Sequence, residues 1–423
     1  MCLEPRTRSR VALIALLSCL IVALGSPAQA HQRPAGDPAV ITDWNATAVR
    51  TIAVEGMRPP AETQLYLGFV SAAVYDAVMA IEPAYAPYGA PLHVHRHASV
   101  DAAVAAAAHG VLSTYFPASA TALDADYQAS LAAIPDGRSE DKGVAVGEAA
   151  AALVEQLRTG DGRNAPITFT RTPAPGVWRP TSAAQFLIPW LGFVRPLLLS
   201  SPTQIPLSGP DALTSDAYTR DFDEVKAYGS KTSTVRTPEQ TETALFWSDN
   251  PVLQFQAALR DRVARRGLDA VETARMFAVL NMSAADALIA TWRAKLDFAF
   301  WRPVTAIHLA DTDGNPATTA DPAWESLIAS PPYPDYPSGH ASVVGAMAKG
   351  LTRLFGRNDI DLVVSSAATG TTRHYTSART LNEDTINARV WLGIHFRKAD
   401  ADANRLGRKV VKLALANDFQ PTR

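Results

Sequence analysis

Apolar residues recur at helical spacing along most of this 423-residue chain, and the alternation typical of β-strands is scarce. In Pro251–Arg266, apolar side chains follow one another on one face of a helix. Asp269 and Glu272 have the spacing of a capping box that opens a second, longer helix. Only the stretch near 371–376 has the composition of short strands. The sequence therefore predicts an all-α fold of helical bundles, two in succession, with little β-structure.

Proline divides the chain into regions. Nine of the 30 prolines fall between positions 166 and 210, and several large aromatic residues lie among them. This composition favours an irregular connector that packs against the body of the protein. We predict an N-terminal helical region over 31–236, which includes the connector (about 166–210), and a C-terminal helical region over 237–423.

The first 30 residues resemble a secretory signal peptide. A basic start precedes a 15-residue apolar run, Val11 to Gly25, and Ala28-Gln29-Ala30 offers a small-x-small cleavage site. The run is shorter than the roughly 20 residues that a membrane-spanning helix needs. We therefore expect cleavage after Ala30, a secreted or periplasmic protein, and no stable membrane insertion.

Cysteine and charge exclude several function classes. Cys2 and Cys19 both lie in the predicted signal peptide, so disulfides, thiolate catalysis and cysteine-ligated metals are excluded from the mature chain. The formal net charge is −2, which gives no indication of a nucleic-acid partner.

Three short stretches in the last third of the chain supply the residue types of an oxyanion site. They are Lys295 with Arg302-Pro303, Pro337-Ser338-Gly339-His340, and Arg389 with His395. Together they offer three cations, a hydroxyl, a glycine amide and two imidazoles. A tetrahedral oxyanion needs such charge-assisted donors, and one imidazole nitrogen could bind or attack its central atom.

Local geometry predicts how each stretch presents these groups. Lys295 and Arg302 are seven residues apart, or two helical turns, so we expect them on one helical face with Arg302 at the helix end before proline. Ser338 precedes a helical pattern whose first amides and dipole would face an anion. Arg389 and His395 are out of phase on an ideal helix, so they must either converge through an irregular segment, which Gly393 would permit, or approach one pocket from two sides. Simpler interpretations are a solvated basic face, a helix cap at Ser338 and a core histidine at 395.

The three stretches resemble the signature shared by vanadium-dependent haloperoxidases and type-2 phosphatidic acid phosphatases. The runs Trp292–Pro303 and Pro332–His340 are similar to the haloperoxidase form. The stretches Asp43–Ala46 and Ala73–Val78 resemble secreted bacterial members of the group. That family has an aspartate four residues after its last histidine. This chain has Ala399 there, and Asp400 follows one position later.

The resemblance implies a helical fold, vanadate as the cofactor, and oxidation of halide by hydrogen peroxide. It implies that His395 is the axial vanadate ligand and that the oxyanion is bound by Lys295, Arg302, Ser338, Gly339 and Arg389. His340, His395 and Lys295 would be the catalytic residues. Trp292 and Tyr333 would line the pocket. Asp400 or Asp402 would orient His395 through its second ring nitrogen, although neither has the spacing typical of the family.

Two other functions remain open at this point. Phosphate is also a tetrahedral oxyanion, so the same residues could serve a secreted acid phosphatase that hydrolyses a phosphate monoester through a phosphohistidine. A non-catalytic oxyanion-binding protein is the third reading, but it would need neither His340 nor His395. The halide preference, the organic substrate and the oligomeric state do not follow from the sequence.

Overall fold

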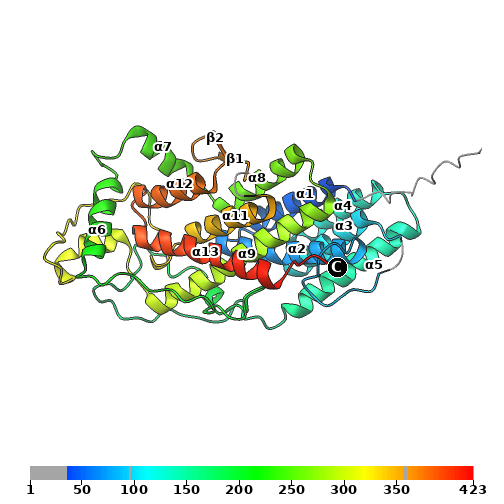
Figure 1. Ribbon diagram of the computed structural model, residues 1–423. Helices are drawn as coiled ribbons and strands as arrows, with labels where there is room; N and C mark the ends of the chain where they lie inside the picture. Colours follow the sequence, from blue (N-terminus) through cyan, green and yellow to red (C-terminus); the bar gives the residue numbers. More distant parts are fainter. Residues whose placement is uncertain (1–35, 95–96, 357–359, 423) are drawn as a thin grey trace, which may run out of the picture. The chain divides into compact units, whose positions relative to one another are not determined.

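This computed structural model describes residues 36–94, 97–356 and 360–422. These residues contain thirteen α-helices and one two-stranded sheet (Figure 1). The all-α prediction is therefore confirmed. The helices are α1 (Pro38–Val49), α2 (Pro60–Ile81), α3 (Val100–Tyr115), α4 (Ala120–Ala132), α5 (Arg138–Leu157), α6 (Asp216–Tyr228), α7 (Pro238–Phe246), α8 (Pro251–Arg266), α9 (Ala270–Phe298), α10 (Pro303–His308), α11 (Gly339–Phe355), α12 (Ala378–Trp391) and α13 (Arg397–Asn417). Short π and 3-10 turns are η1 (Arg50–Glu55), η2 (Pro117–Ser119), η3 (Pro189–Phe193) and η4 (Ala310–Thr312).

The long helix α9 is the centre of the core. It begins as the sequence predicts, with a capping box in which the Asp269 side chain accepts from the Glu272 backbone and Glu272 reaches back to the Asp269 amide. About three quarters of its residues are buried, because α2, α11 and α13 pack around it. Since α2 and α9 lie on opposite sides of position 236, the core runs across the predicted division of the chain. That division stays a prediction.

Helix α2 is apolar on every side. By length and composition it could cross a membrane, but 94% of its most apolar window is buried inside the protein. A helix that is hydrophobic all round is expected in the core of a protein of this size. The predicted signal peptide, by contrast, lies outside the described residues.

The only strand pair among the described residues is a hairpin. β1 (Leu362–Ser366) runs antiparallel to β2 (Thr371–Tyr375), with Leu362 opposite Tyr375. The predicted short strands near 371–376 are therefore present.

The Pro-rich connector is held to the core by one buried carboxylate. Asp286 on α9 accepts hydrogen bonds from the backbone N–H groups of Leu197, Leu198 and Leu199 at 2.6, 2.8 and 2.7 Å. Burial raises the pKa of Asp286 to about 6, against the opposite effect of these three amides. The connector is irregular, as predicted, and these three hydrogen bonds hold its Leu197–Leu199 segment against α9.

Replacing Asp286 by alanine should destabilise the protein by about 3 kcal/mol, because three buried amides lose their acceptor. The native state keeps the Asp286 proton up to about pH 6, whereas the unfolded chain releases it near pH 4. Wild-type stability therefore has a component that falls as the pH rises through this window, and Asp286→Ala lacks it. Urea unfolding of both proteins at pH 4 and pH 7 measures both effects. Asp261→Ala, at a half-exposed ion pair, is the control and should change stability by about 1 kcal/mol or less.

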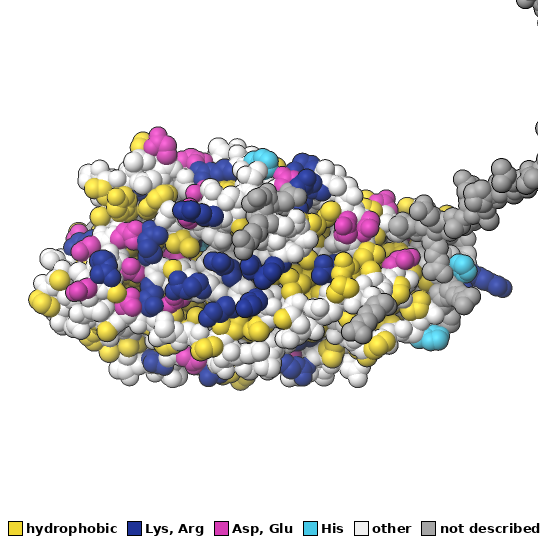
Figure 2. All heavy atoms as spheres, viewed as in Figure 1, with side chains coloured by type: hydrophobic (Ala, Val, Ile, Leu, Met, Phe, Trp, Pro, Cys, Tyr) yellow, Lys and Arg dark blue, Asp and Glu magenta, His cyan; other side chains and the backbone are white. Residues whose placement is uncertain are grey.

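Exposed cations gather on α13. Its outer face presents Arg405, Arg408, Lys409 and Lys412, and Figure 2 shows basic side chains clustered over this part of the molecule. They are separate from the predicted site cations Lys295, Arg302 and Arg389, all of which are buried. A solvated basic face is therefore the wrong description of those three residues.

Candidate active site

Lys295 and Arg302 come together although they do not share a helix. α9 ends at Phe298, and Ala299 takes a left-handed φ of 50°, so the chain leaves the helix before Arg302. Arg302 is extended, with φ −80° and ψ 155°, and caps the start of α10. The expected common helical face is therefore wrong. The prediction that Pro303 keeps Arg302 out of helical geometry is confirmed.

Lys295 is buried among backbone oxygens and aromatic rings. Its ammonium donates to the carbonyl oxygens of Pro334 and Asp335 at 2.5 and 3.1 Å. It also lies 4.9 Å from the centre of the Tyr333 ring. Burial first, and the Arg302 charge second, lower the pKa of Lys295 well below its ordinary value. An anion bound beside this ammonium would restore its charged form.

Arg302 joins this region to His395. Its Nε donates to the Tyr333 carbonyl at 2.8 Å, and one terminal nitrogen donates to the Ile394 carbonyl at 2.6 Å. The same terminal nitrogen lies 3.1 Å from Nε2 of His395. Residues more than 90 positions apart in the chain thus meet at one guanidinium.

The carboxylate that contacts His395 is Asp335. Its Oδ1 lies 2.8 Å from Nδ1 of His395, and both side chains are buried. A neutral imidazole that donates from Nδ1 to this carboxylate leaves Nε2 unprotonated and able to bind a central atom. Burial raises the pKa of Asp335 well above its usual value, while Arg302 and Lys295 act against this. The pKa of His395 is lowered by burial and then by Arg302 and Lys295, which favours the neutral ring.

The prediction that Asp400 or Asp402 orients His395 is therefore replaced. Asp400 lies in the first turn of α13 and is fully buried, but Asp335 occupies Nδ1 of His395. Burial raises the pKa of Asp400 to about 7, against the effects of the Ser338 hydroxyl and Arg389. Asp400 therefore interacts with two other predicted site residues, Ser338 and Arg389, and not with His395 directly.

Helix α11 begins at the second predicted stretch. Ser338 is its N-cap and accepts from the Ala341 amide at 3.4 Å, so capping is part of its role. Gly339 follows directly, and a β-carbon there would stand 2.9 Å from the Trp292 ring. The glycine therefore allows the helix start, with its positive dipole end, to approach α9 closely.

His340 and Arg389 share Trp247 as a support. Arg389 donates to the Trp247 carbonyl at 3.0 Å, and the indole meets the His340 ring edge to face at 5.9 Å. Burial, followed by the Arg389 charge, lowers the pKa of His340 well below its ordinary value. His340 is therefore a neutral imidazole that can accept a proton.

A bend between α12 and α13 brings the third stretch together. Arg389 lies in the last turn of α12, and Gly393 then takes a left-handed φ of 78° before α13 begins. A side chain at Gly393 would meet the backbone of Gly229, so both the conformation and the close approach require glycine. The predicted convergence of Arg389 and His395 through an irregular segment is confirmed.

Three buried nitrogens of the site residues have no hydrogen-bond partner among the described residues. They are the second terminal nitrogen of Arg302, Nε of Arg389 and Nε2 of His340. Oδ2 of Asp335 and both carboxylate oxygens of Asp400 are also unpaired. Buried polar groups are normally paired, and unpaired cations are especially unfavourable. A bound oxyanion would accept from both guanidinium groups, and His340 could exchange a proton with it, so the residues fit vanadate or phosphate.

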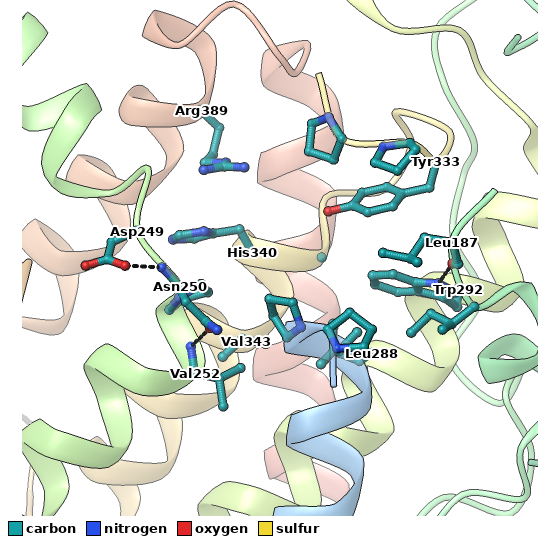
Figure 3. A pocket seen from close by; sticks show the side chains of 18 of the residues that line it. Leu187, Asp249, Asn250, Val252, Leu288, Trp292, Tyr333, His340, Val343 and Arg389 are labelled. Atoms are coloured by element: carbon teal, nitrogen blue, oxygen red, sulfur yellow. Dashed lines mark hydrogen bonds between the residues drawn. The ribbon is translucent and has the colours of Figure 1, made fainter. Parts of the chain in front are cut away.

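A cavity of about 380 Å³ opens beside these residues. Figure 3 shows His340 and Arg389 at one side and Trp292 with Leu187 at the other, while the Tyr333 hydroxyl points toward the middle. Trp292 and Tyr333, the predicted lining residues, both line it and pack 5.1 Å apart, ring centre to ring centre.

Sequence reasoning missed two residues of the site. Asp335 lies inside the aromatic and proline-rich run before Ser338, and an acid in so apolar a run was a usable signal. Trp247 gave no such signal, because its contacts with His340 and Arg389 are long-range and involve its ring and its carbonyl.

Comparisons with known proteins identify relatives of this chain. Residues 275–420 match the family of the VCPO second helical-bundle domain. The vanadium chloroperoxidase of Curvularia inaequalis is 27% identical over 236 residues, a match that covers 41% of this chain and 38% of that protein. The predicted resemblance to vanadium-dependent haloperoxidases is confirmed. The chain therefore matches well under half the length of this curated relative.

Solved structures of vanadium-dependent haloperoxidases share the fold over nearly the whole chain. A bacterial vanadium-dependent iodoperoxidase superimposes with a TM-score of 0.78 and 20% identity, covering 91% of this chain and 97% of that one. A holo-type bacterial vanadium-dependent chloroperoxidase gives a TM-score of 0.70 at 18% identity, covering 90% and 97%. All seven predicted oxyanion-site residues lie within the segment that matches the haloperoxidase domain: Lys295, Arg302, Ser338, Gly339, His340, Arg389 and His395.

Asp335→Asn tests the observed contact with His395. The asparagine side chain has the same shape as aspartate, but its NH₂ group can take the place of the oxygen that accepts from Nδ1 of His395. The tautomer of His395 with the proton on Nδ1 then loses its stabilising acceptor. We expect vanadate affinity to fall by about 10- to 100-fold, as for other partners of metal-binding histidines. Equilibrium dialysis with vanadium analysis measures this affinity. Asp400→Asn is the matched comparison, and an equal or larger loss there would return the orienting role to Asp400.

Proposed function

We propose that this protein is a vanadate-dependent haloperoxidase, which oxidises halide with hydrogen peroxide. The observation that supports this most directly is the set of three buried nitrogens without partners, on Arg302, Arg389 and His340. Nitrogens of this kind, held close to a neutral histidine, suit an anionic cofactor better than a neutral substrate. The similarity to haloperoxidases makes vanadate the preferred oxyanion.

His395 would hold the cofactor through Nε2, because its Nδ1 faces Asp335. Arg302, Arg389 and Lys295 would balance the negative charge, and the Ser338 hydroxyl and the Gly339 amide would donate to oxygens. Bound vanadate supplies a Lewis-acidic centre that activates hydrogen peroxide toward halide.

The remaining chemistry belongs to the protein side chains. Lys295 would place positive charge beside the reacting oxygens, and its buried position strengthens that effect. His340 would hold and move a proton at Nε2, which has no other partner among the described residues. The net reaction consumes halide, hydrogen peroxide and one proton, and it releases hypohalous acid and water.

Paired assays on the purified protein test the proposal against an acid phosphatase. Bromination of monochlorodimedone with peroxide should depend on added vanadate, whereas hydrolysis of p-nitrophenyl phosphate should be weak or absent. Phosphatase activity without vanadate-dependent bromination would favour His395 as a nucleophile on phosphorus. Oxyanion binding without either activity would favour a binding protein. Export is also part of the proposal, and N-terminal sequencing of the mature protein tests cleavage after Ala30.

Phosphate should compete with vanadate for this one site, because both tetrahedral anions would meet the same cations and the same helix start. We expect the apparent Kd of vanadate to rise linearly with phosphate concentration, with no change in the maximum amount bound. Vanadium analysis after dialysis against both anions measures this. A reduced maximum at unchanged affinity would contradict a shared site.

A further inference from the structure

A second depression, of about 370 Å³, lies where α9, α11 and α13 meet the last described residues of the chain. Three cations line it: Arg275 near the start of α9, Arg353 near the end of α11, and Lys412 on α13. None of the described residues that line it is an aspartate or a glutamate. The depression therefore concentrates positive charge, although the formal net charge of the whole chain is −2.

This depression is remote from the candidate active site. Arg275 and Lys295 lie twenty residues apart on α9, and the rise of a helix places them about 30 Å from each other. The depression also shares no lining residue with the cavity beside His340. A ligand bound here would therefore not contact the oxyanion-binding residues.

The packing of α11 against α13 brings two of the cations together. The helices are in close contact, because a β-carbon at Gly345 would collide with the backbone of Asn404. Eight residues further along each helix, Arg353 and Lys412 line the same depression. The two helices therefore run in the same direction, and their like charges are held side by side.

The third cation, Arg275, is fixed against the C-terminal segment. One terminal nitrogen donates to the Phe419 carbonyl at 3.3 Å, and the guanidinium lies 4.0 Å from the centre of the Tyr85 ring. The Ala86 amide donates to the Gln420 carbonyl at 2.8 Å, which holds this segment in place. Nε of Arg275 is buried and has no hydrogen-bond partner among the described residues. A fixed guanidinium with an unused donor is suited to bind an anion.

The protein itself does not neutralise this charge. Arg353 and Lys412 are exposed, and neither forms an ion pair with another described residue. Asp418, the first carboxylate after Lys412, is half-buried and does not line the depression. Like charges held together without a counter-charge repel one another, and a bound anion would relieve this repulsion.

The other lining residues indicate what kind of anion fits. Leu415, Ala416, Phe419 and Pro421 are apolar, so part of the ligand can be apolar too. No described lining residue is a histidine, so the imidazole nitrogen that would bond vanadium in the candidate active site has no counterpart here. Several cations around one group favour phosphate, whose oxygens can accept from more than one of them.

We propose that this depression is a second anion site, which binds a phosphate group that carries an apolar substituent. Arg275, Arg353 and Lys412 bind the phosphate oxygens, while Leu415 and Phe419 contact the substituent. Soluble organic phosphates and phospholipid headgroups both contain such a group. The inference is independent of the proposed function, since it involves none of the oxyanion-binding residues.

The first experiment measures binding of phenylphosphonate, whose carbon–phosphorus bond resists hydrolysis even if the protein is a phosphatase. Calorimetric titration of the protein in the presence of vanadate should show saturable binding that weakens as salt is added. Arg353→Gln/Lys412→Gln should raise the Kd about tenfold, because two charge-assisted contacts are lost. Arg408→Gln/Lys409→Gln removes the same charge from exposed positions on α13 outside the depression, and it should bind as the wild type does.

The second experiment separates the two sources of the phosphate group. Sedimentation with phosphatidylcholine vesicles, with and without phosphatidylglycerol, measures binding to a lipid headgroup. Binding to phosphatidylglycerol vesicles that Arg353→Gln/Lys412→Gln loses and the control variant keeps would identify the ligand as a headgroup. Binding of phenylphosphonate alone would identify it as a soluble organic phosphate.

Two results would overturn the inference. One is that the wild type binds neither phenylphosphonate nor the anionic vesicles. The other is that both double variants bind equally well, which would place the probe elsewhere or reduce the effect to general attraction of charge. Either result leaves the proposed haloperoxidase activity untouched, because bromination is measured separately.

Discussion

His395→Ala should retain no vanadate. In the proposed site, Nε2 of His395 is the only protein atom bonded to vanadium, so without it only hydrogen bonds and charge would hold the anion. Protein loaded with vanadate and passed through gel filtration should therefore show a vanadium content near zero. Elemental analysis beside the protein concentration measures this.

Imidazole provides a rescue for the same variant. The truncated side chain leaves room beside Asp335, and added imidazole could occupy it and restore part of the vanadium content. His374→Ala, at an exposed histidine paired with Asp361, is the matched control and should retain vanadium as the wild type does. Full vanadium content in His395→Ala would show that another residue is the ligand.

His340→Ala should keep vanadate but lose turnover. His340 contacts the support residue Trp247 and has a free Nε2, so its expected role is proton transfer and not anchoring. A positioned proton-transfer group typically contributes about 10²- to 10⁴-fold to the rate. We therefore expect kcat for bromide oxidation to fall by that range while vanadium content stays near one per chain.

The pH profile separates this role from a structural one. If His340 moves the proton, the variant should lose a titration step that the wild-type rate shows. A lower rate with an unchanged pH profile would assign His340 to positioning only. Loss of vanadium from His340→Ala would make it part of the anchor instead.

Lys295 and Arg302 show how much of the site the sequence could predict. The distance of seven residues between Lys295 and Arg302 suggested a shared helical face, and their charge suggested a common anion. The helix ends at Phe298, so the first inference was wrong. The second agrees with the burial of both cations against one segment, the loop before α11. There the Asp335 carbonyl accepts from Lys295, and the Tyr333 carbonyl accepts from Arg302. The number of residues between two side chains predicts whether they share a helical face only if the helix continues through both of them.

The same limit applies to the acid beside His395. Asp400 is close to the histidine in sequence, whereas Asp335 is 60 positions away, and only packing of α13 against the start of α11 decides between them. Both candidate acids are buried, so composition and burial patterns do not distinguish them.

The sequence by itself determined the helical class, the bounds of α8, the start of α9, and which residue types the candidate oxyanion site offers. These follow from local physics: apolar periodicity, capping side chains, and the charge and donor types of individual residues. The tertiary structure alone decided that Asp335 contacts His395, that Trp247 supports His340 and Arg389, and that Pro59, Leu187 and Val252 wall the cavity. Such contacts join residues tens to hundreds of positions apart, and no short-range pattern records them.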